Sequence, residues 1–265
     1  MSKTRSYQGY KVSPEISGGT DDSLTVEEAL QIDINGQSFS VTMQTPGDEI
    51  ALALGLLHSE GLIDYLHLPV VEEVHHNTFG HLIHVDVLLA DMDTENLVNR
   101  RSLLSVASCG ICGSKTLDFA QGEQLIDHQE ILSERIHSLF STMRRGQDAF
   151  DESGGCHAAA AFDLGGELLV LKEDVGRHNA VDKVVGTLLQ ENNLKRAHFL
   201  LVSGRISYEI VAKSFKAKIP ILAAVSAPSS LAVDFAKELG VTLLAFCRQN
   251  RFTIYSHPER IKDAI

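Results

Sequence analysis

Strand-like and helix-like segments alternate through the second half of this chain, and that rhythm constrains its fold more than any other feature. Short apolar runs give way repeatedly to amphipathic stretches of roughly ten residues, a usual helix length. The expected strands are 167–171, 199–202, 221–225 and 242–246, and the expected helices are 179–190, 208–216 and 231–239. Such alternation builds βαβ units, so we expect a largely parallel sheet covered by helices.

The first half is richer in strand-like segments. Apolar and polar residues alternate from Glu28 to Thr45 around Asn35-Gly36, a pair that tolerates the positive φ angles of a tight hairpin turn. The other expected elements are, in order, a helix opened by Pro46-Gly47-Asp48 and closed by Gly61, strands at 70–75 and 81–89, a polar connector at 91–101, a strand at 102–107 and a helix at 127–145.

These patterns divide the chain into three parts. Residues 1–23 are polar and read as a loosely ordered lead-in, residues 24–125 form a β-rich part, and residues 126–265 form an α/β part. The two larger parts need not fold independently of one another. The fold class is therefore α/β or α+β, with a smaller β-rich region preceding a layered C-terminal region.

The charge balance excludes several classes of protein. The 265 residues include 35 acidic and 23 basic side chains, a formal net charge of −12. Such a field repels nucleic acids and anionic membrane surfaces, so neither is an expected partner. No run approaches the roughly 18 apolar residues of a membrane-spanning helix, and the first residues lack the apolar core of a signal peptide. We therefore expect a cytoplasmic location.

Two of the four cysteines, Cys109 and Cys112, stand three residues apart in the motif SCGICG. A thiolate is a nucleophile, and a second thiol two residues away can relay or protect whatever the first acquires. Gly110 and Gly113 give the loop freedom to approach another molecule, and the nearby Lys115 favours the thiolate. This arrangement is typical of a carrier that accepts sulfur as a persulfide.

Other readings of the cysteine pair stay open on these residues alone. A zinc site needs four ligands, and the adjacent Cys156 and His157 would chelate one ion awkwardly. A thioredoxin-like redox pair should open a long helix, whereas residues 113–124 look like a loop. The pair can also be two small residues in a loop without chemistry. The histidines 75, 76, 81 and 84 are read as a polar strand face rather than a metal cluster.

Basic side chains recur where expected strands end and helices begin. Arg177, His178 and Lys183 lie in the segment EDVGRHNAVDK, and Arg205 follows the next strand in SGRIS. A third junction, SAPSS at 226–230, repeats this strand–helix layout without a basic residue, and the arginines of FCRQNR at 246–251 follow the last long strand. Ligands of open α/β sheets collect at the carboxyl ends of strands. Each group has a plain structural alternative, such as an ion-pair network of Asp174, Arg177 and Asp182, but together they predict an anionic ligand of modest size.

Six motifs in combination resemble one family. SCGICG, GGCHAAAAFD, EDVGRHNAVDK, SGRISYE, SAPSSLAV and FCRQNR together resemble the formate dehydrogenase accessory sulfurtransferase family, FdhD, from the hairpin near Asn35 to Tyr255. The resemblance implies a three-layer, cytidine-deaminase-like fold with a mixed sheet, and a homodimer. It also implies a sulfurtransferase that takes persulfide sulfur from a cysteine desulfurase. The sulfur would pass to the bis-molybdopterin guanine dinucleotide cofactor that a formate dehydrogenase apoenzyme requires.

The resemblance also assigns roles to residues. Cys109 resembles the persulfide-bearing cysteine, with Cys112 as its partner. The stretch that resembles the cofactor contact, to which a guanine nucleotide such as GDP can bind, comprises Phe246, Cys247, Arg248, Gln249, Asn250, Arg251, Phe252 and Thr253. The places of Arg177, His178, Lys183 and Arg205 at strand ends, rather than the resemblance, make them further expected contacts to its phosphates. The chain lacks the H-x-E and P-C-x-x-C signature of zinc deaminases, so no metal ligands are expected.

Two other functions remain as alternatives. The first is a chaperone that binds and delivers the molybdopterin cofactor without transferring sulfur. The second is a regulatory module that binds a guanine nucleotide. Whether Cys109 ever carries sulfur separates both of them from the sulfurtransferase.

Overall fold

The structure is a computed structural model that describes residues 2–15, 17–72, 82–89 and 123–263. Its strands are β1 (Thr4–Val12), β2 (Ser17–Thr25), β3 (Glu28–Ile34), β4 (Gln37–Gln44), β5 (Val70–Glu72), β6 (Leu82–Leu88), β7 (His157–Asp163), β8 (Leu168–Asp174), β9 (Ala197–Val202), β10 (Ile221–Ala224), β11 (Thr242–Arg248) and β12 (Arg251–Ser256). Its helices are α1 (Glu49–Ser59), α3 (Ser133–Arg145), α4 (Asp148–Ser153), α5 (Arg177–Gln190), α6 (Tyr208–Lys216) and α7 (Ser230–Leu239), with short 3₁₀ turns η1 (Leu194–Arg196) and η2 (Pro258–Arg260).

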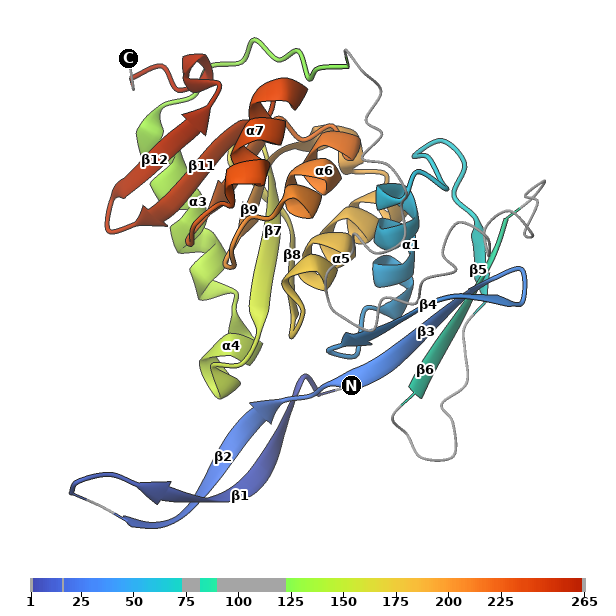
Figure 1. Cartoon of the computed structure of the whole chain (residues 1–265), viewed down its shortest axis with the longest axis vertical. Coiled ribbons are helices and arrows are strands. Elements are labelled where there is room, and N and C mark those ends of the chain that lie inside the picture. Colours follow the sequence, from blue (N-terminus) through green and yellow to red (C-terminus); the bar gives the residue numbers. More distant parts are fainter. Residues whose placement is uncertain (1, 16, 73–81, 90–122, 264–265) are drawn as a thin grey trace.

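The C-terminal body is built on a mixed sheet in the order β12-β11-β10-β9-β7-β8 (Figure 1). The strands β9, β10 and β11 are parallel, whereas β7, β8 and β12 join through antiparallel pairs. The expected parallel arrangement therefore holds only for the centre of the sheet, because short hairpins connect β7 to β8 and β11 to β12. As a result β8, β9, β10 and β11 all end at one edge of the sheet, where β7 and β12 begin.

Helices cover both faces of this sheet. Alternate residues of β9 show the division: Leu200 packs in the core beneath α5, α6 and α7, while Phe199 packs in the core beneath α3. The α3 side chains Ile136, Leu139 and Met143 close that second face and are almost completely buried. The fold is thus a three-layer α/β body, as the fold class predicts.

A second sheet, β4-β3-β6-β5, lies beside this body and packs on α1 (Figure 1). The β3–β4 hairpin turns at Asn35 and Gly36, which have φ angles of 51° and 74°, so this prediction is confirmed. Leu30 and Val85 of this sheet belong to the same core cluster as Val184 and Leu200 of the body. The hydrophobic core is therefore continuous across the boundary expected at 125/126.

Two glycines hold the parts together, because α1 and α5 cross at Gly55 and Gly186. A Cβ atom on Gly55 would overlap the carbonyl group of Asp182 in α5, and one on Gly186 would overlap the carbonyl group of Ala51 in α1. Only glycine permits backbones to approach this closely. The α1–α5 crossing therefore fixes the smaller sheet, which packs on α1, against the face of the main sheet that α5 covers.

Residues 1–23 are not the loosely ordered lead-in that the sequence predicts. β1 and β2 form a regular antiparallel ribbon, with pairs from Thr4↔Thr25 to Val12↔Ser17, that projects away from the body (Figure 1). A hydrogen bond of 2.7 Å between the hydroxyl groups of Thr25 and Ser153 ties its base to α4. Neither face of the ribbon is buried, so the apolar–polar alternation that reveals most strands is missing here.

Other differences concern element boundaries. The helix expected at 127–145 begins only at Ser133, because 127–132 runs extended and Ile131 bridges to Ile261. The helix expected at 179–190 begins two residues earlier, at Arg177. The α6 prediction matches its helix residue for residue. The connector at 91–101, the strand at 102–107 and the cysteine pair lie outside the described residues. No described helix has the length and apolar character to span a membrane.

Candidate functional site

The predicted cofactor stretch 246–253 forms a β-hairpin rather than a segment beyond the last strand. Ala245 pairs with Thr253 and Arg248 pairs with Arg251, so Phe246 and Cys247 together oppose Phe252 alone. This is a β-bulge, a device that redirects side chains at functional sites. Phe246 has φ +56°, a conformation that is strained for an aromatic residue. The strain indicates that the position of its ring is imposed by the fold.

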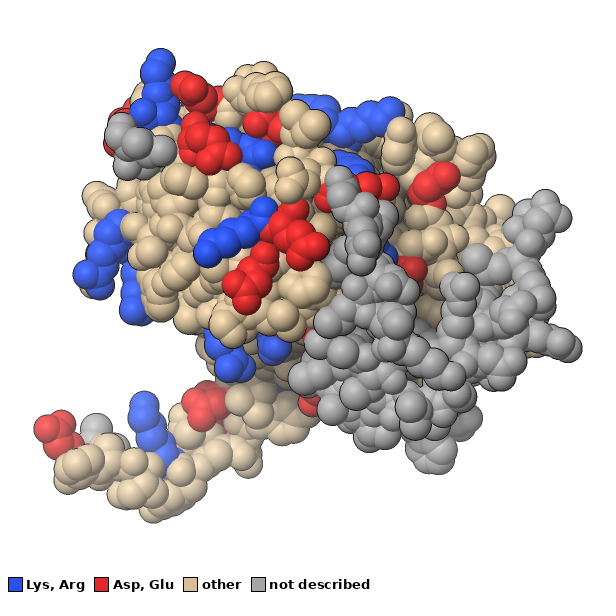
Figure 2. Space-filling view, turned by 45° about the horizontal axis from the view of Figure 1, so that its top comes forward, with Lys and Arg blue, Asp and Glu red and all other residues tan. Residues whose placement is uncertain are grey.

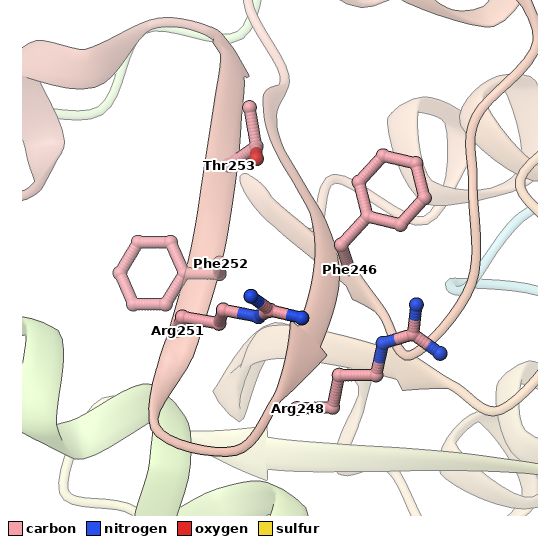
Figure 3. A pocket seen from close by; sticks show the side chains of 5 residues that line it. All are labelled: Phe246, Arg248, Arg251, Phe252 and Thr253. Atoms are coloured by element: carbon pink, nitrogen blue, oxygen red, sulfur yellow. The ribbon is translucent and has the colours of Figure 1, made fainter.

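A pocket of about 260 Å³ opens beside this bulge, lined by Phe246, Arg248, Arg251, Phe252 and Thr253 (Figure 3). The guanidinium groups of Arg248 and Arg251 lie toward the same side as the Phe246 ring. The combination of cationic and aromatic groups in this pocket suits a ligand that has a flat ring and a phosphate group.

The hairpin turn explains the geometry of the two arginines. Gln249 and Asn250 both have positive φ angles, 54° and 55°, as a two-residue type I′ turn requires. The turn makes Arg248 and Arg251 the first cross-strand pair, and both side chains are exposed. Like charges placed directly opposite destabilise a hairpin. An anion held between them would remove that repulsion.

Not every residue of the stretch faces the pocket. Gln249 and Asn250 form the turn, and Cys247 is buried in the core cluster beneath α3. Burial raises the pKa of the Cys247 thiol to about 12. Cys247 is therefore a small core residue in the hairpin, with no thiolate to offer a ligand.

A second group of basic residues, the strand-edge cluster, comprises His157, Arg177, His178 and Arg205. His157 begins β7, Arg177 and His178 begin α5 after β8, and Arg205 follows β9. The register pairs His157 with Asp174 and Ala159 with Val202, which brings the three junctions together. A Cβ atom on Gly204 would lie 3.2 Å from Nδ1 of His157 and 3.3 Å from Cβ of Arg177. The sequence prediction that the junction of Arg177 meets the junction of Arg205 is confirmed, and His157 joins them.

The two histidines of the cluster are held in their neutral forms. Burial, aided by the charges of Arg177 and Arg205, lowers the pKa of His157. Burial and the charges of Lys213 and Arg177 lower the pKa of His178 to about 4. The Nε2 atom of His178 lies 3.1 Å from the hydroxyl of Ser207, the residue that precedes α6. His178 is thus engaged within the protein, while His157 has no such partner among the described side chains.

Lys183 does not belong to this cluster, contrary to the prediction. Its side chain is completely buried, and its ammonium group lies 2.7 Å from Asp174 and donates to the carbonyl of Thr45. Asp174 also accepts hydrogen bonds from the backbone of Thr45 and of Gly176. The pair fixes the β8–α5 turn that presents Arg177, so Lys183 cannot reach a phosphate.

The ion-pair network of Asp174, Arg177 and Asp182, which the sequence offered as an alternative to ligand binding, does not form in the structure. Asp182 pairs with Lys213 at 2.6 Å, and Asp174 pairs with Lys183. Arg177 takes part in neither pair. The carboxylates that the sequence offered as its partners are thus already neutralised by lysines.

The structure assigns Cys156 a structural position. Its thiol donates to a carboxylate oxygen of Glu173 at 3.4 Å, and Glu173 accepts from the backbone of α4 as well. Burial and the Glu173 charge raise the pKa of Cys156 to about 12. Cys109 and Cys112, which were expected to carry the chemistry, lie outside the described residues.

The described residues contain no group of three or more histidine, cysteine or acidic side chains that could hold a metal ion. His84 pairs with Asp33 on the smaller sheet, and the other histidines of its motif lie outside the described residues.

The strained bulge at Phe246 has no signal in the sequence, because positive φ angles are usually marked by glycine or asparagine.

Basic side chains project from the rim of the body on the side where β11 and β12 lie, although the chain as a whole is acidic (Figure 2). Elsewhere on the described part of this face, acidic and basic side chains are interspersed. The described part of this face therefore carries no continuous basic band of the kind that binds a long polyanion.

Comparison with known proteins gives a consistent result. Residues 25–262 match the model of the FdhD/NarQ family. "Sulfur carrier protein FdhD" of Sulfolobus acidocaldarius is 42% identical, over 95% of this chain and 96% of the relative, and that of Thermoplasma acidophilum is 45% identical, over 91% and 87%. A crystal structure from Desulfotalea psychrophila, whose description suggests a formate dehydrogenase accessory protein, has a TM-score of 0.76 and 23% identity, with coverage of 98% and 100%. The chain belongs to the FdhD/NarQ family.

Proposed function

We propose that this chain is a sulfur carrier that takes persulfide sulfur from a cysteine desulfurase and delivers it to the bis-molybdopterin guanine dinucleotide cofactor of a formate dehydrogenase. The name shared by its relatives, sulfur carrier protein FdhD, supports the first half of this proposal. The observation that carries the second half is the exposed Arg248–Arg251 pair beside the strained Phe246.

The pocket residues fit one end of that cofactor. The two guanidinium groups can share a phosphate through charge-assisted hydrogen bonds, which are stronger than neutral ones. The ring of Phe246, on the same side as the two guanidinium groups, offers apolar surface to a guanine base, whereas the ring of Phe252 points to the other side and packs against His137 of α3. A volume of about 260 Å³ suits a nucleotide end rather than a whole dinucleotide cofactor. The rest of the cofactor would extend along the edge where β8 to β11 end.

The sulfur transfer follows thiol chemistry. The thiolate of Cys109 attacks the outer sulfur of the donor's persulfide, so one S–S bond forms, another breaks, and the donor cysteine leaves as a thiolate. Attack of Cys112 on the inner sulfur of the resulting persulfide would release the outer sulfur as hydrosulfide to the cofactor. That step leaves a Cys109–Cys112 disulfide, which a dithiol reductant returns to two thiols.

Intact-protein mass spectrometry tests the carrier role. After incubation with a cysteine desulfurase and cysteine, the wild type should gain one sulfur atom that a reductant removes. Cys109→Ala should gain none, whereas Cys156→Ala, which removes a buried thiol, should load like the wild type. Absence of sulfur on the wild type, with the desulfurase shown to be active, would contradict the proposal.

Calorimetric titration with GDP tests the pocket. Arg248→Ala and Arg251→Ala should each weaken GDP binding by about tenfold or more, the usual effect of losing a hydrogen bond to a charged group. Arg145→Gln removes an equal charge from the exposed end of α3 and serves as the control. Equal losses in all three variants would indicate a general charge effect and would reject the pocket.

A chaperone that binds the cofactor without transferring sulfur is the second candidate. The observation in its favour is that neither of the two cysteines in the described part of the chain, Cys156 and Cys247, lines the pocket, and that Cys247 is buried. GDP binding that persists together with a complete failure of sulfur loading would favour this candidate.

A further inference from the structure

The strand-edge cluster lies apart from the hairpin pocket on the same edge of the sheet. Arg205 follows β9 and Arg248 ends β11, with β10 between these two strands. Neighbouring strands are about 4.8 Å apart, so the two junctions are separated by about 10 Å. This edge of the sheet therefore carries two basic sites, the strand-edge cluster near the end of β9 and the hairpin pocket at the end of β11.

The two arginines of the cluster have no protein partners among the described residues. Neither Arg177 nor Arg205 forms an ion pair or a side-chain hydrogen bond there, although ten other basic side chains take part in ion pairs. The Nε–H group of Arg177 is buried without an acceptor. Buried donors are nearly always satisfied, so a ligand or a water molecule can supply the acceptor for this one.

Two carboxylates act on the histidines of the cluster, Asp174 on His157 and Glu209 on His178. Asp174 already pairs with Lys183 and accepts from Thr45, Gly176 and Asn179. The helices α5 and α6 both begin at this edge without a side-chain cap, so their first N–H groups have no capping side chain to accept from them. His157 adds a neutral imidazole that can donate one hydrogen bond.

The floor of the cluster is shaped for close approach. Gly204 lies so near His157 and Arg177 that even a methyl group would crowd both. A larger side chain at this position would push the His157 imidazole and the aliphatic stem of Arg177 apart. The glycine therefore keeps these two side chains close together.

We propose that His157, Arg177 and Arg205 form a second anion site, distinct from the hairpin pocket, that takes a phosphate group. The site itself rests on this cluster alone. That the same elongated ligand occupies both positions, with phosphates about 10 Å apart, rests on the function proposed above. His178 is a supporting residue that holds Ser207 and does not contact the ligand.

The test uses inorganic phosphate and the full-length protein with labelled histidines. The His157 imidazole signals in NMR spectra, assigned with His157→Gln, should shift and saturate as phosphate is added to the wild type. Arg205→Ala, a change of an exposed side chain, should weaken this response by about tenfold or more. Arg177→Lys, which keeps the charge but loses the fork of donors, should weaken it as well.

Two controls separate the sites. Arg248→Ala removes a pocket arginine and should leave the phosphate response of His157 within about twofold, and so should Arg145→Gln on α3, because neither side chain belongs to the cluster. A wild-type His157 signal that ignores phosphate would overturn the proposal, as would equal losses in Arg205→Ala and Arg145→Gln. Such a failure would not touch sulfur loading of Cys109, so the two proposals fail separately.

Discussion

Nζ of Lys183 and Oδ2 of Asp174 lie 2.7 Å apart, and neither side chain is exposed to solvent. Lys183→Met should therefore lower the free energy of unfolding by about 3–5 kcal/mol, because it leaves a buried carboxylate without its counter-charge. Urea denaturation measures this loss. The exposed Arg205→Ala should stay within about 0.5 kcal/mol of the wild type.

The double variant Asp174→Asn, Lys183→Met checks the reason for that loss. Removing both charges should recover part of the stability that Lys183→Met loses. If the loss of unfolding free energy in the double variant equalled the sum of the losses in Asp174→Asn and in Lys183→Met measured separately, the two residues would not act as a pair.

Gly55→Ala should destabilise the protein by at least about 3 kcal/mol, since the new methyl group would overlap the backbone of Asp182 and force α1 away from α5. Thermal unfolding followed by circular dichroism measures the change. Gly18→Ala is the matched control, because nothing lies within 4 Å of a Cβ atom at that position on the β1–β2 ribbon. An unchanged melting temperature in Gly55→Ala would mean that the helices do not cross this closely.

Thiol labelling should distinguish the cysteines. Burial raises the pKa of Cys156 and of Cys247 to about 12, so at pH 8 neither holds an appreciable fraction of thiolate. Iodoacetamide should leave both unmodified in the native protein and label both in urea, with peptide mass spectrometry as the readout. Rapid native labelling of Cys156 would contradict its burial beside Glu173.

Acid should weaken the fold partly through His58. Burial, together with the charges of Lys216 and Lys213, lowers the pKa of His58 from 6.5 to about 4. Between these values the unfolded chain binds a proton that the folded chain refuses, so the stability that this group contributes is complete above pH 6.5 and is lost as the pH falls toward 4.

The slope of stability against pH tests this titration. Each such histidine contributes up to about 1.4 kcal/mol per pH unit in that window. Urea denaturation of the wild type and of His58→Gln between pH 4 and 7 should give a shallower slope for the variant. Parallel slopes would show that His58 does not titrate in this way. His178, whose pKa is also lowered to about 4, should keep the slope of the variant above zero.

Much of the fold follows from local patterns in the sequence. The Asn35-Gly36 turn and α6 are correctly predicted because turn residues and helical periodicity act over a few positions. The β1–β2 ribbon cannot be predicted from such local patterns, since both of its faces are exposed and its residues are mostly polar. Its order comes from cross-strand pairing and from contacts of its base with α4.

The site was predictable in part for similar reasons. Arg177 and Arg205 could be grouped because strands of known direction deliver their junctions to one edge. The prediction that Lys183 contacts a phosphate is wrong, because its neighbours in sequence do not reveal that it lies on the buried side of α5. There it pairs with Asp174. The conformation of Phe246 depends on a register shift between β11 and β12, which no local pattern encodes.

The helix crossing at Gly55 and Gly186 also bears on how members of the family can exchange segments. Each glycine is required by a backbone carbonyl group in the other half of the chain, so neither half alone explains its own glycine. A chimera of two relatives that joins their halves between α1 and α5 should fold only if both parents keep a glycine at its crossing point. Recombination within the family is therefore limited at two positions, one on each helix, where no side chain larger than the hydrogen atom of glycine fits.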